Sequence, residues 1–302
     1  MAPGYFAPSA LALIRKPWAL RQQRNSPIKA RRRSCTLWVL RSPRLALLTR
    51  PQWQGEETPR LGDARLLHAP LQTLERCPVA IADLEAIFVA PDPWLVCTSP
   101  ASVQALQAWL KEFGNDLLAV AGLRFAAVGS GTRDQLAKRL AGESRQIICP
   151  LSDETADANG LLAVFDSIQR TEGFDWSAQT LLIVEGQNNR PTLGDGLRAR
   201  GAEVIAVGFY ARHDQDWEST IWDRFKQYGH SELAVIVTST GVIDRLLGQC
   251  RARGIDPTQL LWCTQHPTIA ARLRQAGCEQ LRRVRLDPQF LTGDLFDHEF
   301  GW

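Results

Sequence analysis

Residues 94–106 read Trp94-Leu-Val-Cys-Thr98-Ser99-Pro-Ala-Ser-Val103-Gln-Ala-Leu106, and residues 234–246 repeat the pattern as Ala234-Val-Ile-Val-Thr238-Ser239-Thr-Gly-Val-Ile243-Asp-Arg-Leu246. In each copy a short apolar run ends in Thr-Ser, and apolar residues follow five and eight positions after the threonine. The apolar run is typical of a buried strand, and the later spacing is typical of one face of a helix. Each copy therefore predicts a strand that leads directly into a helix.

Similar apolar runs alternate with helical spacing from Arg44 onward. The predicted strands are Leu45–Thr49, Trp94–Cys97, Phe125–Val128, Leu181–Val184, Val204–Val207, Ala234–Val237 and Leu260–Cys263. Short buried strands that alternate with helices predict parallel α/β sheets. Two further pairs of segments repeat as well, namely 125–132 with 261–268 and 47–51 with 183–186. The simplest interpretation is two similar α/β domains, each of about 110 residues.

Hydroxyl groups and glycines gather where the predicted strands end. They are Thr98, Ser99, Gly129, Thr132, Gly186, Thr238 and Ser239. The carboxyl ends of parallel strands are where ligands bind in open sheets, and a helix that begins there offers free N–H groups and a positive dipole end. These residues therefore predict a cleft that binds an anion. The alternative is that they only cap helices.

The positive charge of the chain is concentrated at its start. Residues 1–50 contain eleven Arg or Lys and no Asp or Glu, which leaves 24 basic against 32 acidic residues in the remainder. A nucleic-acid-binding function would therefore depend on the first segment, and the acidic remainder argues against it. We interpret residues 1–43 as a basic, disordered extension. It is an organelle transit peptide, a dispensable tail or the result of a start codon placed too far upstream.

Several other classes of protein are disfavoured. No apolar run is long enough to span a bilayer, so no membrane contact is expected. The seven cysteines are scattered without a CxxC pair, which fits reduced thiols in the cytoplasm better than disulfides or a zinc site. Gly129-Ser130-Gly131 is a fragment of a dinucleotide-binding motif, but Asp134 replaces its third glycine. The five histidines lack the spacing of metal ligands, so no metal site is expected.

One long stretch resembles a known family. Residues 181–212 run Leu181-Leu-Ile-Val-Glu-Gly-Gln-Asn-Asn-Arg-Pro-Thr-Leu-Gly-Asp-Gly-Leu-Arg-Ala-Arg-Gly-Ala-Glu-Val-Ile-Ala-Val-Gly-Phe-Tyr210-Ala-Arg212. This stretch is similar to the strand, helix, Arg-Gly-Ala-x-Val, strand and Tyr-x-Arg series of uroporphyrinogen-III synthases. Residues 47–51, 125–132 and 237–239 resemble other motifs of the same family in the same order. The resemblance extends from Arg44 to Arg285.

The resemblance implies a fold of two Rossmann-like parallel-sheet domains joined by a two-stranded linker. Domain 1 would be discontinuous, with residues 44–67 and 213–302. Residues 68–80 and 204–212 would form the linker, and residues 81–203 would form domain 2. This arrangement agrees with the internal repeat.

The resemblance also implies the reaction. The substrate would be hydroxymethylbilane, a linear tetrapyrrole with eight carboxylates. Loss of hydroxide from ring A would give an electrophilic azafulvene, and ring D would attack through its substituted α-carbon to form a spiro intermediate. Fragmentation and reclosure would invert ring D without a cofactor. We expect a monomer, and a contact with the preceding enzyme of the pathway is left open.

Site residues follow from the resemblance. Tyr210 matches the family tyrosine, and its phenol would donate a proton to the departing hydroxyl; the alternative is an aromatic residue packed in the linker. Arg50 and Arg212 would pair with substrate carboxylates; the alternative for Arg212 is a solvated charge at the end of a strand. Gly186 would let the backbone approach the ligand, and Asn188 is a further candidate for binding. The alternative function is a non-catalytic two-domain protein that binds a small polyanion.

The sequence departs from the family pattern at three places. The segment between Thr49 and Gly62 is about one helical turn short, and Pro59 interrupts it. Glu185 stands where an arginine is often found before the glycine. His266-Pro267 replaces the usual turn before Thr268. These departures concern local parts of the site and leave the order of strands and helices unchanged.

Overall fold

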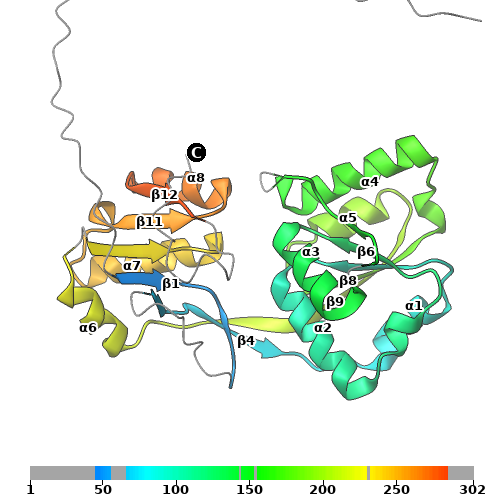
Figure 1. Ribbon diagram of the computed structural model, residues 1–302, viewed down its shortest axis with the longest axis horizontal. Coiled ribbons are helices and arrows are strands. Elements are labelled where there is room, and N and C mark those ends of the chain that lie inside the picture. The colour runs from blue at the N-terminus through cyan, green and yellow to red at the C-terminus, as the bar shows by residue number, and fades with distance from the viewer. Residues whose placement is uncertain (1–44, 56–65, 143, 153–154, 230–231, 285–302) are drawn as a thin grey trace, which may run out of the picture. The chain divides into compact units, whose positions relative to one another are not determined.

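The protein is a mixed α/β structure with two sheets built mainly from parallel strands (Figure 1). The computed structural model describes residues 45–55, 66–142, 144–152, 155–229 and 232–284. The basic segment 1–43 and Pro59 and Gly62 of the shortened segment lie outside these ranges.

The first sheet has five strands in the order β12-β11-β10-β1-β3, and all of its pairings are parallel. Its strands are β1 (Leu45–Leu48), β3 (Leu66–His68), β10 (Leu233–Ile236), β11 (Leu261–Thr264) and β12 (Leu281–Arg283). Its helices are α6 (Ser219–Gln227), α7 (Ile243–Ala252) and α8 (Pro267–Gln275). Because β1 lies between two strands and is covered on both faces, all four of its residues are buried and apolar.

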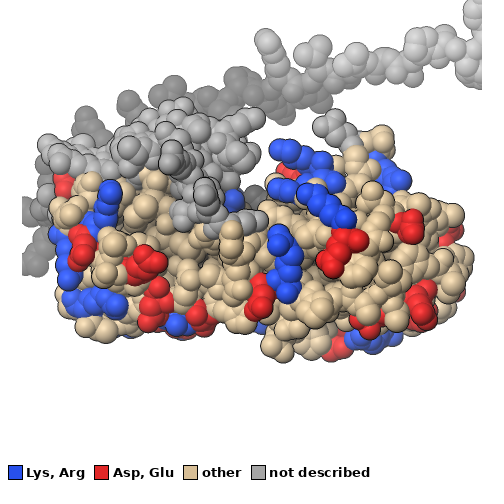
Figure 2. Space-filling view, turned by 90° about the horizontal axis from the view of Figure 1, so that it is seen from below, with Lys and Arg blue, Asp and Glu red and all other residues tan. Residues whose placement is uncertain are grey.

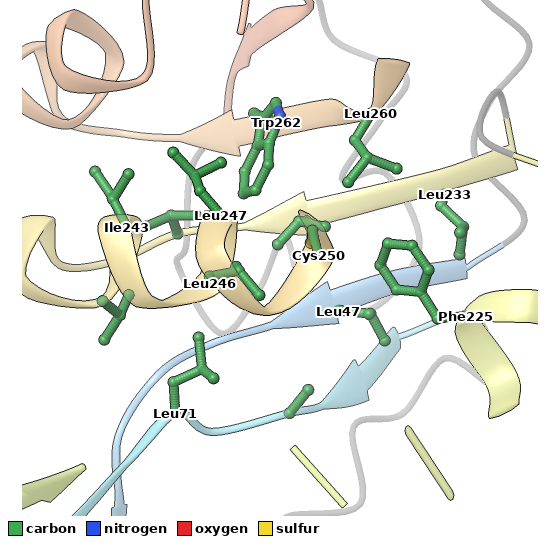
Figure 3. Packing of buried hydrophobic residues seen from close by; sticks show 14 of the residues in the cluster. Leu47, Leu71, Phe225, Leu233, Ile243, Leu246, Leu247, Cys250, Leu260 and Trp262 are labelled. Carbon is green, nitrogen blue, oxygen red and sulfur yellow. The ribbon is translucent and has the colours of Figure 1, made fainter. Parts of the chain in front are cut away.

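The core of this sheet forms between its strands and the three helices. Leu47, Leu233 and Trp262 point from the strands toward Leu246 of α7 and Phe225 of α6 (Figure 3). Ala46, Leu48 and the other alternate strand residues belong to a separate cluster on the opposite face. This alternation is the two-residue period of a strand.

The second sheet has seven strands in the order β2-β4-β9-β8-β5-β6-β7. Its strands are β2 (Gln52–Trp53), β4 (Gln72–Arg76), β5 (Trp94–Cys97), β6 (Arg124–Ala127), β7 (Ile147–Ile148), β8 (Thr180–Gly186) and β9 (Glu203–Asp214). All of its pairings are parallel except that of β4 with β9. The register of that antiparallel pair runs from Gln72 opposite Asp214 to Arg76 opposite Tyr210.

Helices pack on both faces of the seven-stranded sheet. They are α1 (Glu85–Val89), α2 (Pro100–Phe113), α3 (Ser130–Leu136), α4 (Ala158–Glu172) and α5 (Thr192–Arg198). Leu95 and Cys97 of β5 lie in one apolar cluster with residues of α1, α2 and α3. Trp94 and Val96 lie in another with residues of α4 and α5. Burial of both faces explains why β5 is apolar throughout.

Short helical turns complete the described part of the chain. They are η1 (Ile81–Leu84), η2 (Asp116–Ala119), η3 (Ala137–Ala141), η5 (Trp176–Ala178), η7 (Thr240–Val242) and η8 (Pro257–Gln259). The η3 turn extends α3 and ends at Gly142, whose positive φ of 77° suits a glycine.

The predicted strands are confirmed to within a residue or two, with one exception. The run 204–207 is only the start of β9, which continues to Asp214 because its second half pairs with β4. The apolar pattern did not predict the short strands β2, β3, β4, β7 and β12. β4 nevertheless lies within residues 68–80, which the resemblance assigned to the two-stranded linker. β2 lies inside the range 44–67 expected for domain 1, yet it pairs with β4 in the seven-stranded sheet.

Charged side chains of both signs are mixed on the face drawn in Figure 2. Figure 2 shows Lys and Arg interspersed with Asp and Glu on one face of the molecule. Within the described residues, none of the helices combines the length and apolar character needed to cross a bilayer.

Candidate active site

The end of β5 carries the first Thr-Ser pair, and Ser99 begins α2 there. Its Oγ accepts a hydrogen bond from the Ser102 N–H at 3.1 Å, and the Ser102 Oγ accepts one from the Ser99 N–H at 3.2 Å. This reciprocal arrangement is a capping box, and Pro100 at the first helical position is also favourable. The predicted role of Ser99 as an N-cap is confirmed.

Tyr210 of β9 contacts the same serine although 111 positions separate them in the sequence. Its hydroxyl lies 3.0 Å from the Ser99 Oγ, and the Arg212 Nη2 donates a hydrogen bond to it at 2.6 Å. Tyr210 is 0% exposed, Ser99 is half-buried and Arg212 is exposed. Tyr210 and Arg212 share a face of the strand because strand residues two apart point the same way.

A β-bulge sets the orientation of the Tyr210 side chain. The register of β8 with β9 shifts between Glu185 and Gly186, so that Gly186 lies opposite Tyr210 and Phe209 is skipped. A bulge bends its strand and turns successive side chains out of strict alternation. Phe209 and Tyr210 can therefore both be buried in the same apolar cluster.

Gly186 leaves the space that the tyrosine ring fills. A Cβ on Gly186 would lie 2.9 Å from the Tyr210 Cζ, which is closer than real Cβ atoms approach other atoms. Position 186 therefore suits a glycine because the Tyr210 ring occupies the space that a side chain would need. The predicted approach of a ligand to its backbone stays a prediction.

Trp53 also packs against Tyr210, and it was not identified from the sequence as a residue of the site. The two rings meet edge to face with centroids 5.8 Å apart. The Trp53 Nε1 donates to the Gln104 Oε1 of α2 at 2.5 Å, and Arg76 lies 5.1 Å above the Trp53 ring. Trp53 lies in the segment that departs from the family pattern, so no motif signalled it.

Other predicted residues of the seven-stranded sheet lie at neighbouring strand ends. Thr98 donates from its Oγ1 to the Val184 carbonyl at 3.3 Å. Gly129 precedes the first turn of α3, and Thr132 within that turn is buried. Asn188 follows β8, is exposed, and has a φ of +56°. Such left-handed backbone is tolerated better by asparagine than by most residues.

The remaining predicted residues belong to the five-stranded sheet. Thr238 and Ser239 follow β10, and the Ser239 Oγ accepts from the Gly241 N–H at 3.3 Å, which confirms it as an N-cap. Arg50 follows β1 and is exposed, and its carbonyl lies 2.7 Å from the His68 Nε2. Burial lowers the pKa of His68 from its ordinary value, and its Nδ1 has no partner among the described residues.

Cys97 lies directly before the Thr98-Ser99 pair but is no candidate for nucleophilic catalysis. The side chain is fully buried, and burial raises the pKa of the Cys97 thiol to about 12. A neutral thiol is a poor nucleophile and a poor metal ligand. Within the described ranges, no group of three or more His, Cys, Asp or Glu is arranged to hold a metal ion.

The geometry thus combines a buried phenol, a half-buried hydroxyl and an exposed guanidinium at the carboxyl ends of parallel strands. The uroporphyrinogen-III synthase HemD family model matches residues 59–283. The chain belongs to the uroporphyrinogen-III synthase family. Uroporphyrinogen-III synthases are cyclising lyases of porphyrin biosynthesis that act without a cofactor on hydroxymethylbilane. The alternative of a non-catalytic binding protein is therefore set aside.

Solved structures of uroporphyrinogen-III synthases share the fold. A mutant synthase from the extremely thermophilic bacterium Thermus thermophilus has a TM-score of 0.52 at 16% identity, with 82% of this chain and 95% of that chain covered. The synthetase from Helicobacter pylori has a TM-score of 0.50 at 13% identity, with 80% and 92% covered. No curated protein sequence matches the chain. At such low identity these uroporphyrinogen-III synthases support the α/β fold and not individual site residues.

Proposed function

We propose that this uroporphyrinogen-III synthase converts hydroxymethylbilane into its macrocycle through a spiro intermediate that inverts ring D. The observation that carries the proposal is the hydrogen-bonded group of Ser99, Tyr210 and Arg212 at the strand ends. It supplies a proton donor for the departing hydroxyl and a cation for a carboxylate. Since uncatalysed closure gives the symmetric isomer, the main task of the protein is to hold the chain ends in the productive geometry.

The two sheets correspond to two domains in this proposal. Domain 1 comprises residues 44–67 and 213–302, domain 2 comprises residues 81–203, and residues 68–80 and 204–212 form the linker. The antiparallel pairing of β4 with β9 supports the linker, because these two strands extend the seven-stranded sheet beyond its parallel part. The five-stranded sheet supports a discontinuous domain 1, because β1 pairs with both β3 and β10.

Hydroxyl and amide donors bind the substrate carboxylates in this proposal. The candidates are Thr98, Ser99, Gly129, Thr132, Gly186, Asn188, Thr238 and Ser239, with Arg50 and Arg212 as the cations. Exposure supports Arg50, Arg212 and Asn188 as groups that a ligand can reach. The helix that begins after Ser99 adds backbone N–H groups and a favourable dipole for an anion. Neutral donors can bind the eight carboxylates of the substrate without placing a large positive charge in the site.

Tyr210 supplies the proton for the first step. When the C–O bond of the ring A hydroxymethyl group breaks, its electron pair goes to oxygen, and one proton converts the departing hydroxide into water. The ring nitrogen contributes the electrons that form the azafulvene. The guanidinium of Arg212 stabilises the negative charge that the phenol acquires, since its Nη2 is already hydrogen-bonded to that oxygen.

We also propose a monomer in the cytoplasm, with hydroxymethylbilane supplied by the preceding pathway enzyme. The six described cysteines are free thiols, and four of them are buried, which supports a reducing compartment. Gel filtration with light scattering measures the mass of the purified chain. A mass near 33.7 kDa supports the monomer, and twice that mass contradicts it.

The decisive experiment supplies freshly prepared hydroxymethylbilane to the purified protein without added cofactor. The porphyrin isomers are separated after oxidation. Predominant type III product is expected. Type I product alone, formed at the spontaneous rate by protein with a native circular dichroism spectrum, would contradict the proposed activity.

A further inference from the structure

The Tyr210 hydroxyl is placed to give up a proton but not to touch a substrate. Tyr210 is 0% exposed, and its ring is held by Trp53 and by the space beside Gly186. Ser99, which its hydroxyl contacts, is half-buried at the carboxyl end of β5. A ligand at the strand ends therefore meets the serine hydroxyl before it meets the phenol.

Two of the three hydrogen bonds that join these groups have a direction fixed by their nitrogen donors. Arginine has only donors, so the Arg212 bond makes the Tyr210 oxygen an acceptor. Either oxygen of the Tyr210 and Ser99 pair can be the donor at 3.0 Å, and in one of the two arrangements the phenolic hydrogen points to the Ser99 Oγ. That Oγ also accepts from the Ser102 N–H, which occupies its second lone pair. In this arrangement the Ser99 hydrogen has no acceptor among the described residues.

We propose that Ser99 is the catalytic residue that touches the departing hydroxyl, and that Tyr210 and Arg212 act through it as a proton relay. The inference rests on the proposed function and assigns its proton transfer to a different side chain. In this arrangement Tyr210 is a positioning residue and a proton reservoir. The Arg212 guanidinium stabilises the negative charge that remains on the Tyr210 oxygen.

The proton transfer balances in both directions. When the hydroxymethyl C–O bond breaks with its electron pair on oxygen, that oxygen takes the Ser99 proton and leaves as water. Ser99 takes the Tyr210 proton, and a phenolate remains beside the Arg212 guanidinium. The carbon of ring D that bonds last loses its proton when its pyrrole is restored. That proton returns through Ser99 to Tyr210, so the net change is the loss of one water from the substrate.

The test needs variants that separate proton transfer from helix capping. Ser99→Asn keeps an excellent N-cap and a hydrogen-bond acceptor, but an amide cannot relay a proton. Ser99→Thr keeps the hydroxyl. Tyr210→Phe removes the next member of the relay. Asp157→Ala removes the N-cap of α4, where the side chain accepts from the Gly160 N–H, and serves as a control for the loss of a cap alone.

The measurements are kcat, KM and the fraction of type III product with hydroxymethylbilane. A relay predicts that Ser99→Asn lowers kcat by about 10²- to 10⁴-fold, the usual range for a general acid, with KM changed by less than about threefold. Ser99→Thr should keep kcat within about tenfold of wild type. The variant with both Ser99→Asn and Tyr210→Phe should have a kcat no lower than that of the slower single variant. The losses of kcat are not additive when two residues act as one unit.

Three outcomes would overturn the relay. A near-wild-type kcat in Ser99→Asn beside a large loss in Tyr210→Phe would mean that Tyr210 donates directly. An increase in KM alone makes Ser99 a binding residue. Additive losses in the double variant mean two independent roles. Type III product from wild-type protein keeps the proposed function intact in each case, whereas its absence from wild type removes that function first.

Discussion

Ser99 and Ser239 occupy the same position in the two copies of the sequence repeat but have different surroundings. Both follow a buried strand and a threonine, and both accept a hydrogen bond from a backbone N–H two or three residues later. Only Ser99 has a tyrosine within hydrogen-bond distance in the part of the chain that the structure describes. The local motif is thus repeated, whereas the chemistry built on it is not.

The difference arises from the strands beside each serine. β9 runs parallel to β8, which separates it from β5, and then continues to pair with β4. Tyr210 lies opposite Gly186 at the end of β8, and its hydroxyl contacts Ser99, which follows β5. The strands beside β10 are the shorter β1 and β11, and neither continues in this way. A capped helix therefore becomes a candidate catalytic site only where a long strand adds a partner.

The largest effect is expected from removing the Tyr210 hydroxyl, which distinguishes the surroundings of Ser99 from those of Ser239. Tyr210→Phe should lower kcat by about 10²- to 10⁴-fold, because it removes the proton while it keeps the ring. Its thermal stability should fall only slightly, because a typical hydrogen bond contributes about 1 kcal/mol net. Steady-state kinetics and a melting curve on the same preparation check both. A kcat within twofold of wild type would leave Tyr210 with a structural role alone.

Gly186→Ala should disturb the tyrosine without touching its hydroxyl. The new Cβ would lie 2.9 Å from the Tyr210 Cζ, so the ring must shift. Overpacking of this kind costs about 1–3 kcal/mol of unfolding free energy, and kcat should fall with it. Gly248→Ala in α7 is the matched control, because nothing lies within 4 Å of its Cβ. It should gain up to about 1 kcal/mol in urea unfolding.

Ser239→Ala tests the serine in the second copy of the repeat, where no tyrosine of the described residues lies within hydrogen-bond distance. The lost cap should cost about 0.5–2 kcal/mol of stability, and KM should rise while kcat stays close to wild type. Urea unfolding and steady-state kinetics measure the two effects. A fall in kcat as large as that of Ser99→Asn would mean that both copies carry the same chemistry.

The smallest effect is expected at His68, where β3 ends in the five-stranded sheet. Because burial lowers its pKa in the folded state, the unfolded chain binds a proton first as the pH falls. The stability contributed by the neutral ring is therefore present above about pH 6.5, the ordinary pKa of histidine, and is lost below it. His68→Gln should flatten the decline of stability between about pH 7 and pH 5. An unchanged slope in urea unfolding would contradict this.

The sequence by itself determined the longer buried strands, the helix caps and the repeat, because these depend on residues close together in the chain. Four apolar residues before Thr98 and Thr238 are enough to predict β5 and β10, and a serine before a helix is enough to predict a cap. The motif around Tyr210 also indicated the family. The apolar pattern predicted only the first part of β9, since its second half carries polar and charged residues whose strand conformation depends on β4. The resemblance assigned residues 204–212 to the two-stranded linker.

Only the tertiary structure decided how these pieces combine. The contact of Ser99 with Tyr210 spans 111 positions, and it requires the order of strands, the bulge at Gly186 and the room left by that glycine. Trp53 joined the site through β2, a two-residue strand too short to show any periodicity. Hydrophobic periodicity specifies which residues are buried, whereas strand pairing specifies which residues meet. For that reason the sequence indicated a tyrosine and a serine, and the fold placed one behind the other.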